Sequence, residues 1–277
     1  MKLLKVIGAA VIGLTVLATQ AFAADAAGVR TMMEKSGIVA QYTDLGAQIR
    51  DGLLKSPPPM LPAGVVSLMA TIVGNTMDGR KLLDQVQTVL AASLSADDVV
   101  AMDSFFDSDL GTRLVKAEIA GDAPAVQDEI GANAEALVAE AKKDPQRAAV
   151  FERIDQMLNT SELSARSSES LLRAMAVAMA ENGPTPPDPD RFAQADARIT
   201  AMHGALVTQA RAMMLASAER VYRGFSTAEV ETYAKFLETG PAQIMYAAFS
   251  GIMGTFYAET GKRIGEELAA AVRQQKT

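Results

Sequence analysis

Apolar side chains recur every three or four positions through most of the chain, with polar or charged side chains between them. That spacing places the apolar residues on one face of an α-helix. Two clear stripes are Val65, Val66, Leu68, Met69, Ile72 and Val73, and then Phe249, Ile252, Met253, Phe256 and Ile264. No convincing run alternates apolar and polar residues between turn residues. The pattern therefore predicts an all-α protein, a helical bundle with essentially no sheet.

Glycine and proline divide this pattern into separate helices. The expected helices cover residues 26–54 with an interruption near Gly37, 62–78, 81–92, 95–107, 110–142 with a bend at 121–124, 146–158, 161–180, 190–223, 226–238 and 240–273. Proline-rich segments at 56–59 and 183–189 end helices, because proline lacks the N–H donor that a helix interior needs. Gly224 is the candidate C-cap of the helix before it.

A short motif occurs twice, at 94–108 and, 131 residues later, at 225–239. The two proline-rich segments are separated by about the same interval. Only three of the fifteen paired positions are identical, namely Ser95/Ser226, Val99/Val230 and Phe105/Phe236. We interpret the pattern as a duplication that gives two related helical units, 24–144 and 145–277. The alternative is that any two capped amphipathic helices look alike.

Both copies of the motif carry the signals that begin a helix. Ser95 and Ser226 suit the N-cap position, where a hydroxyl accepts from an unpaired backbone N–H. Asp98 and Glu229 follow three residues later, where a carboxylate completes a capping box. Apolar residues then follow at matching steps: Val99, Met102, Phe105 and Phe106, and Val230, Tyr233, Phe236 and Leu237. We therefore predict two equivalent capped helices.

The first copy and the turn after it resemble the domain-of-unknown-function 2059 family, on Ser95, Asp98, Phe105, Phe106, Ser108, Gly111 and Arg113. The resemblance implies an exported, all-helical bacterial protein without an established activity. The second copy fits less well, since Thr239 matches Ser108 but Ala242 stands where Gly111 would be. These residues, with Ser226, Glu229, Phe236, Leu237 and Thr239, are the candidate structural or interaction motif. The alternative is that each turn is simply a tight helix–helix connection.

Residues 1–23 have the form of a secretory signal peptide. Lys2 and Lys5 give a positive start, an apolar stretch follows, and Ala21-Phe22-Ala23 is a suitable cleavage site. Cleavage would leave 254 residues (277 minus 23) and change the net charge from −7 to −9. We therefore expect a periplasmic protein, or one secreted to the exterior, with no membrane span after cleavage.

Composition excludes several classes of function. The acidic chain is a poor partner for nucleic acid or an anionic membrane surface. It has no cysteine, which rules out disulfides, thiolate catalysis and cysteine-based metal sites. Phosphate-binding glycine loops and the common zinc-protease and serine-hydrolase motifs are absent from the sequence. We expect no catalytic residue, no metal site and no cofactor.

Few residues offer chemistry of their own. His203, the single histidine, lies within the expected helix 190–223 and lacks the partners of a metal site or a catalytic triad, so we interpret it as an ordinary helix residue. The acidic pairs near 97–98 and 107–109 lack the layout of a calcium loop. Methionine clusters at 32–33, 175–179 and 213–214 suit core packing, an apolar ligand or partner groove, or Cu(I), and we favour core packing.

Three functions remain open. We favour a non-enzymatic interaction or scaffold module with a protein partner, because long apolar helices occur without any catalytic constellation. The alternative is a carrier of an apolar small ligand between the helices. An enzyme with a site assembled from dispersed acids and arginines is the least favoured.

Overall fold

The computed structural model describes residues 23–55, 57, 62–182 and 189–274. Within these ranges the chain forms α-helices and no β-strand, which confirms the all-α prediction. One isolated antiparallel bridge joins Ala23 to Ser95, and the N–H of Ala24 donates to the carbonyl of Leu94 at 3.0 Å. The predicted signal peptide, apart from Ala23, lies outside the described residues, as do Ser56, 58–61 and 183–188 of the proline-rich segments.

The helices of the first half are α1 (Ala26–Lys35), α2 (Ile38–Tyr42), α3 (Leu45–Lys55), α4 (Ala63–Thr76), α5 (Gly79–Ser93), α6 (Ala96–Phe106), α7 (Asp109–Gly121), α8 (Pro124–Ala132) and α9 (Ala134–Ala141). Those of the second half are α10 (Pro145–Leu158), α11 (Thr160–Asn182), α12 (Pro189–Ala201), α13 (His203–Val221), α14 (Thr227–Leu237) and α15 (Gly240–Gln274). The predicted interruption at Gly37 is confirmed, since this residue has a φ of 81°, a conformation that favours glycine.

Four of the predicted helix boundaries were wrong. After Gly37 the chain does not form one helix to residue 54, because a turn at Thr43 and Asp44 separates α2 from α3. Residues 110–142 form α7, α8 and α9, because Asn133 adds a second break to the predicted bend. The expected helix 190–223 is divided at Met202 into α12 and α13. Gly224 is not the C-cap of α13, since Tyr222 holds that position and its N–H donates to the carbonyl of Ala218. None of the additional breaks carries a proline, which is why periodicity alone missed them.

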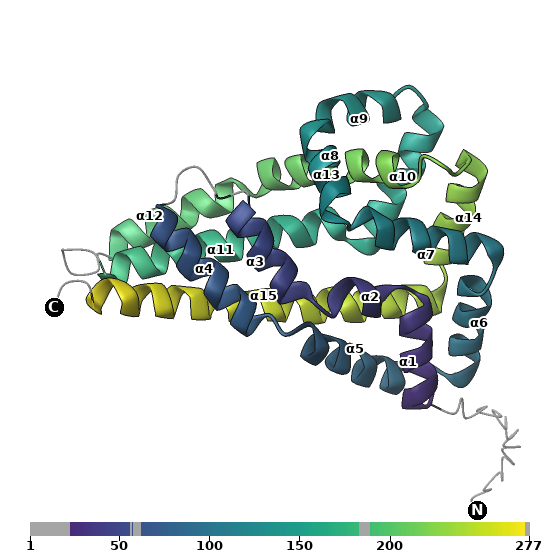
Figure 1. Cartoon of the computed structure of the whole chain (residues 1–277), viewed down its shortest axis with the longest axis horizontal. Coiled ribbons are helices and arrows are strands. Elements are labelled where there is room, and N and C mark those ends of the chain that lie inside the picture. The colour runs from purple at the N-terminus through teal and green to yellow at the C-terminus, as the bar shows by residue number, and fades with distance from the viewer. Residues whose placement is uncertain (1–22, 56, 58–61, 183–188, 275–277) are drawn as a thin grey trace, which may run out of the picture.

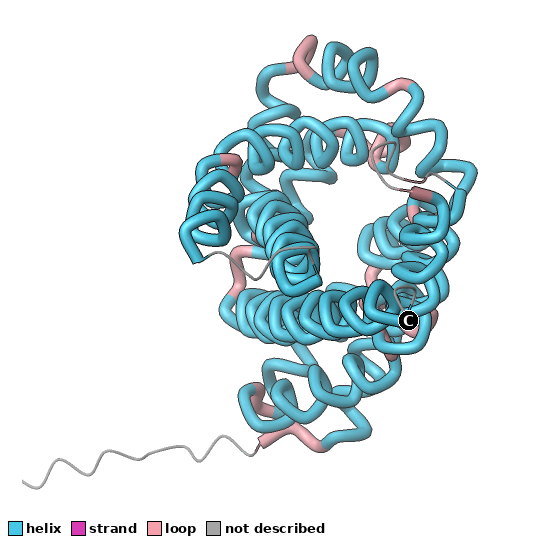
Figure 2. Tube along the Cα trace, turned by 90° about the vertical axis from the view of Figure 1, so that its left-hand side faces the viewer, coloured by secondary structure: helices cyan, strands magenta, loops and turns pink. Residues whose placement is uncertain are grey.

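The longest helix, α15, runs along one side of the molecule and packs against α11, α4 and α5 (Figure 1). Helix α13 packs against α11 and α9, and α3 pairs with α4. Seen at a right angle, the tubes of the long helices are arranged around the centre of the molecule (Figure 2).

The main hydrophobic core includes side chains from both predicted units, and Ile130, Leu137 and Ala216 form a smaller second cluster. The fully or nearly fully buried members of the main core include Met32, Leu82, Leu90, Phe106, Phe151, Val230, Leu237 and Met245. Burying a side chain of this size stabilises a fold by about 1.5–3 kcal/mol. Met32 and Met33 are fully buried core residues, as predicted. The side chains of Met175 and Met179 are not among those that the structure describes.

Candidate functional site

The two copies of the repeated motif lie against each other. The rings of Phe105 and Phe236, which occupy equivalent positions in the motif, stack with centroids 3.8 Å apart and an interplanar angle of 4°. Phe106 meets Phe236 edge-on at 5.2 Å, and the Leu237 side chain is fully buried. Aromatic pairs add about 0.5–1.5 kcal/mol beyond the area that they bury. This contact between α6 and α14, together with the turn after each helix, is called the seam below.

Both predicted capping boxes are present at the seam. The Asp98 N–H donates to the hydroxyl of Ser95 at 3.2 Å, and the Ser95 N–H donates back to the Asp98 carboxylate at 2.9 Å. Ser226 and Glu229 repeat the arrangement at 3.3 and 2.8 Å. The hydrogen bond from the Ser226 backbone, followed by that from Arg113, lowers the pKa of Glu229 to about 2. These residues are occupied in starting the two helices.

The turns after α6 and α14 are also similar. The Ser108 hydroxyl donates to the Phe105 carbonyl at 2.6 Å, and the Thr239 hydroxyl donates to the Phe236 carbonyl at 2.7 Å. Ser108 also accepts from the Gly111 N–H at 3.0 Å and so caps α7. A Cβ on Gly111 would lie 2.0 Å from the Phe105 carbonyl oxygen, which explains the glycine.

Arg113 joins the two copies by charge. Its guanidinium lies 2.8 Å from the Glu229 carboxylate and sits over the Phe225 ring, 4.9 Å from the centroid. The structure thus brings Phe105, Phe106 and Phe236 together and joins Arg113 to Glu229, while Ser95 and Asp98 pair with each other at the start of α6. The geometry supports the interpretation of a tight helix–helix connection.

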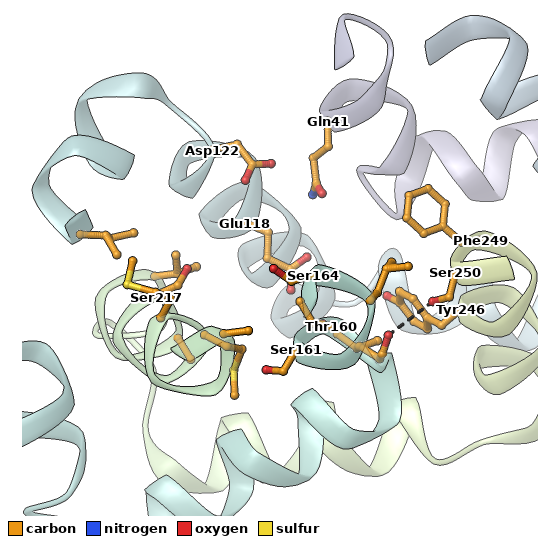
Figure 3. A pocket seen from close by; sticks show the side chains of 18 of the residues that line it. Gln41, Glu118, Asp122, Thr160, Ser161, Ser164, Ser217, Tyr246, Phe249 and Ser250 are labelled. Atoms are coloured by element: carbon orange, nitrogen blue, oxygen red, sulfur yellow. Dashed lines mark hydrogen bonds between the residues drawn. The ribbon is translucent and has the colours of Figure 1, made fainter. Parts of the chain in front are cut away.

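A second region, which includes Tyr233 of the repeated motif, has the geometry of a ligand site. A cavity of about 690 Å³ lies between α2, α7, α8, α10, α11, α13, α14 and α15 (Figure 3). Its polar lining residues are Ser36, Gln41, Tyr42, Glu118, Asp122, Gln127, Thr160, Ser161, Ser164, Ser168, Gln209, Ser217, Tyr222, Tyr233, Tyr246 and Ser250. Sites for small organic ligands occupy about 300–1,000 Å³. We call this the central cavity.

Glu118 is the most unusual residue of the central cavity. It is partly buried, and its carboxylate accepts a hydrogen bond of 2.6 Å from the Tyr222 hydroxyl. Burial raises the pKa of Glu118 because the charged form loses its water, while hydrogen bonds from Tyr222 and Tyr233 oppose that rise. Asp122, one helical turn further on, is exposed at the end of α7, and partial desolvation raises its pKa. A carboxyl whose pKa is raised beside a cavity marks a candidate functional site.

Four tyrosines surround these acids. Burial, as the largest cause, raises the pKa of Tyr42, Tyr222, Tyr233 and Tyr246 above the usual range of a phenol. Their hydroxyls therefore stay neutral and can donate hydrogen bonds at any physiological pH. Phe249 adds another aromatic ring to the wall and packs edge-on against Tyr42 at 4.5 Å.

Sequence reasoning missed the central cavity, although one signal was present. Glu118 follows Leu114 by four residues and Gly111 by seven, so it falls on the buried face of α7. A carboxylate on an apolar stripe is a departure from the helix pattern. The tyrosines gave no such signal, because they come from three helices and one connecting segment that only tertiary packing brings together.

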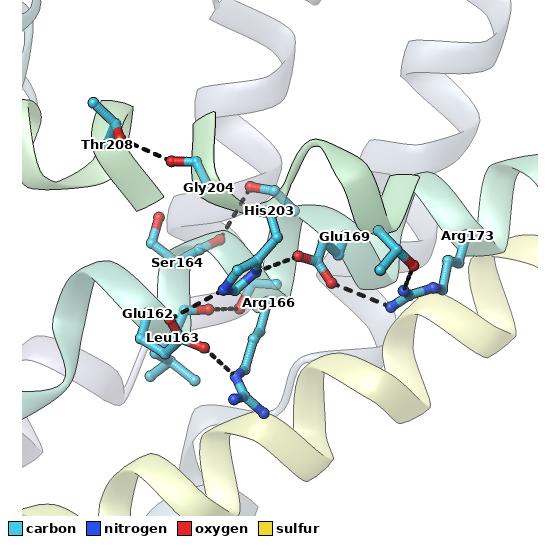
Figure 4. Close-up of polar contacts among 12 residues, drawn as sticks. Glu162, Leu163, Ser164, Arg166, Glu169, Arg173, His203, Gly204 and Thr208 are labelled. Atoms are coloured by element: carbon cyan, nitrogen blue, oxygen red, sulfur yellow. Dashed lines mark hydrogen bonds and ion pairs between the residues drawn. The ribbon is translucent and has the colours of Figure 1, made fainter. Parts of the chain in front are cut away.

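His203 lies in a different polar cluster, shown in Figure 4. It is the first residue of α13 rather than a residue in mid-helix, and its Nδ1 lies 2.5 Å from the buried carboxylate of Glu169. Its Nε2 lies 3.4 Å from Glu162, and Arg173 lies 3.3 Å from the other oxygen of Glu169. The cluster joins α11 to the start of α13, so His203 has a specific structural setting that the sequence did not reveal.

The central cavity and the His203 cluster are separate sets of residues. His203 is not among the residues that line the central cavity. The serine, threonine and tyrosine hydroxyls of the cavity therefore have no histidine beside them. Among the described residues, no group of three or more acidic or histidine side chains could hold a metal ion. In the same part of the chain, no helix has both the length and the apolar character needed to cross a membrane.

Comparisons of the chain with protein-family models, with curated proteins and with solved structures found no match. The resemblance to the domain-of-unknown-function 2059 family therefore stays a prediction. Function has to be inferred from the central cavity itself.

Proposed function

We propose that this protein is an exported, all-helical carrier that binds a small organic molecule in the central cavity. The observation that carries the proposal is the partly buried carboxyl of Glu118, hydrogen-bonded to Tyr222, in a cavity of ligand size. A purely structural core would gain stability by filling that space with apolar side chains. The leader-like residues 1–23 support export, which cell fractionation of the tagged protein would test.

The proposal is the second function considered from the sequence, a carrier of a small ligand between the helices. It differs in one respect, the polarity expected of the ligand. Apolar residues such as Met213 and Met214 do line the central cavity, but hydroxyls, amides and carboxyls are at least as prominent. The ligand is therefore expected to carry a polar group as well as an apolar body. The interaction module favoured from the sequence stays a prediction.

Ligand binding can be tested with the neutral dye Nile red, whose fluorescence rises in an apolar site. Ser217 lines the central cavity, and Ser217→Phe would place a ring inside it. Ser104→Phe introduces the same ring on the exposed face of α6 and is the matched control. We expect the dye to bind the natural protein and the control but not Ser217→Phe. Equal binding by both variants would show that the dye sits elsewhere.

Native mass spectrometry of freshly purified protein provides a second test. A molecule that occupies the central cavity in the cell is expected to appear as an added mass, and to be lost from Ser217→Phe. The absence of any bound mass, together with no dye binding, would overturn the carrier proposal.

We also infer that the two helical units arose by duplication. Support comes from an ion pair in each unit that joins its first helix to the end of its capped helix, although only the acidic residues are separated by 131 positions. The Lys35 ammonium lies 2.7 Å from Asp107, and the Arg153 guanidinium lies 3.2 Å from Glu238, which is the equivalent position. An experimental structure in which α6–α7 and α14–α15 fail to superpose would contradict this inference.

A further inference from the structure

The central cavity has an acidic and not a basic character. Glu118 and Asp122 both face it from the last part of α7 and its C-cap. Of the described residues that line it, none is lysine, arginine or histidine. An anionic ligand would meet two carboxyls without a compensating cation, and such like-charge contacts oppose binding. A cationic ligand would instead supply the missing counter-charge.

The aromatic lining points the same way. Tyr222 and Tyr233 interact with Glu118, and Tyr42, Tyr246 and Phe249 complete an aromatic wall. The face of an aromatic ring attracts a cation, and cages of such rings bind ammonium groups in many proteins. The combination of carboxyl and rings suits a cation that is attached to an organic body.

One buried hydroxyl in the wall of the central cavity lacks a hydrogen-bond partner within the described structure. It belongs to Ser161, a residue that is only 3% exposed. Buried polar atoms are normally paired, and an orphan calls for a specific explanation. A ligand that carries several N–H donors could bond this hydroxyl as well as a carboxylate.

We propose that the central cavity binds a protonated amine on an apolar or aromatic body, with the ammonium group beside Glu118. This proposal rests on the ligand-binding role proposed above and names the chemical class of the ligand. The ammonium donates to the carboxylate and to serine hydroxyls, while the body packs against Met213, Met214 and Phe249.

The chain has no tryptophan, so an indole ligand can be observed directly by its own fluorescence. Tryptamine, tryptophol and indoleacetate carry the same ring on a cationic, a neutral and an anionic side chain. Fluorescence anisotropy of each is measured against increasing concentrations of the purified protein. We expect tryptamine to bind about tenfold or more tightly than tryptophol, as one charge-assisted contact predicts, and indoleacetate to bind weakest.

Glu118→Gln tests the contact itself, because glutamine keeps the shape of the side chain and removes its charge. We expect its affinity for tryptamine to fall to that for tryptophol. Glu135→Gln makes the same change on the exposed face of α9 and is expected to leave binding unchanged. Asp122→Asn offers a second test should Glu118→Gln fail to give the natural circular dichroism spectrum, and a weaker loss is expected there.

The outcomes separate this proposal from the carrier role. Equal affinity for the three indoles, with Nile red still excluded by Ser217→Phe, would overturn the cationic ligand and leave the carrier role standing. Unchanged tryptamine affinity in both Glu118→Gln and Asp122→Asn would also overturn it. Failure of every indole and of Nile red to bind would overturn both.

Discussion

Replacing Gly111 by alanine tests whether the first turn of α7 has to lie as close to α6 as it does. A Cβ at this position would lie 2.0 Å from the Phe105 carbonyl oxygen and 2.9 Å from the Phe106 Cα. Both neighbours are backbone atoms, so no rotamer change can relieve the overlap. Reaching an ordinary contact of 3.4 Å would require α7 to move by about 1.4 Å relative to α6.

Overpacking of this kind costs about 1–3 kcal/mol and occasionally more, and we expect the upper end because backbone must move. A loss of about 3 kcal/mol lowers the melting temperature of a chain of this size by about 6–12 °C. Thermal unfolding followed by far-ultraviolet circular dichroism measures that shift. Tryptamine affinity should fall as well, because Glu118 lies two turns further along the displaced helix.

Gly251→Ala is the matched control. Gly251 lies exposed in the middle of α15, and a Cβ there would meet nothing within 4 Å. Alanine is favoured over glycine in a helix interior by about 1 kcal/mol, so this variant should melt slightly above the natural protein. An unchanged melting temperature for Gly111→Ala, with the control behaving as expected, would refute the close contact between α6 and α7.

Three further variants test the central cavity and the seam. Glu118 has a raised pKa in the folded protein, so its carboxyl costs stability as pH rises above its ordinary value of 4.5. Glu118→Gln should therefore raise the melting temperature at neutral pH. The gain in unfolding free energy should be about 1.4 kcal/mol for each unit by which the folded protein raises the pKa of Glu118. This gain should disappear below pH 4.5, where the carboxyl becomes protonated in both states. Phe105→Leu and Phe236→Leu, combined in a double-mutant cycle with urea unfolding, should show a coupling of about 0.5–1.5 kcal/mol. Arg147→Met should cost about 3–5 kcal/mol in the same assay, because it leaves the Glu219 carboxylate, only 11% exposed, without its cation at 3.6 Å.

The controls for these variants differ. If Glu118→Gln is less stable than the natural protein at neutral pH, the inference that the charged Glu118 carboxylate costs stability is wrong. Additive effects of the two phenylalanine changes would show that the rings pack without a specific interaction. Adding Glu219→Gln to Arg147→Met should recover part of the loss, and no recovery would assign the cost to the hydrogen bonds from Arg147 to the carbonyls of Phe225 and Tyr222.

Helix start signals were the most reliable part of the sequence. Ser95 with Asp98 and Ser226 with Glu229 form the predicted capping boxes, because a cap depends only on residues three positions apart. The breaks at Asn133 and Met202 could not be predicted. Each lies where a helix turns to follow its neighbours, and nothing in the local periodicity requires the chain to stop there.

The amino-acid sequence alone determined the helical class, the caps and the apolar face of each helix, since these depend on contacts within one or two turns. Only the tertiary structure decided that Phe105 stacks on Phe236 and that the aromatic rings of distant segments gather around Glu118. Such meetings depend on how helices far apart in the chain cross one another, and that is set by the packing of the whole core.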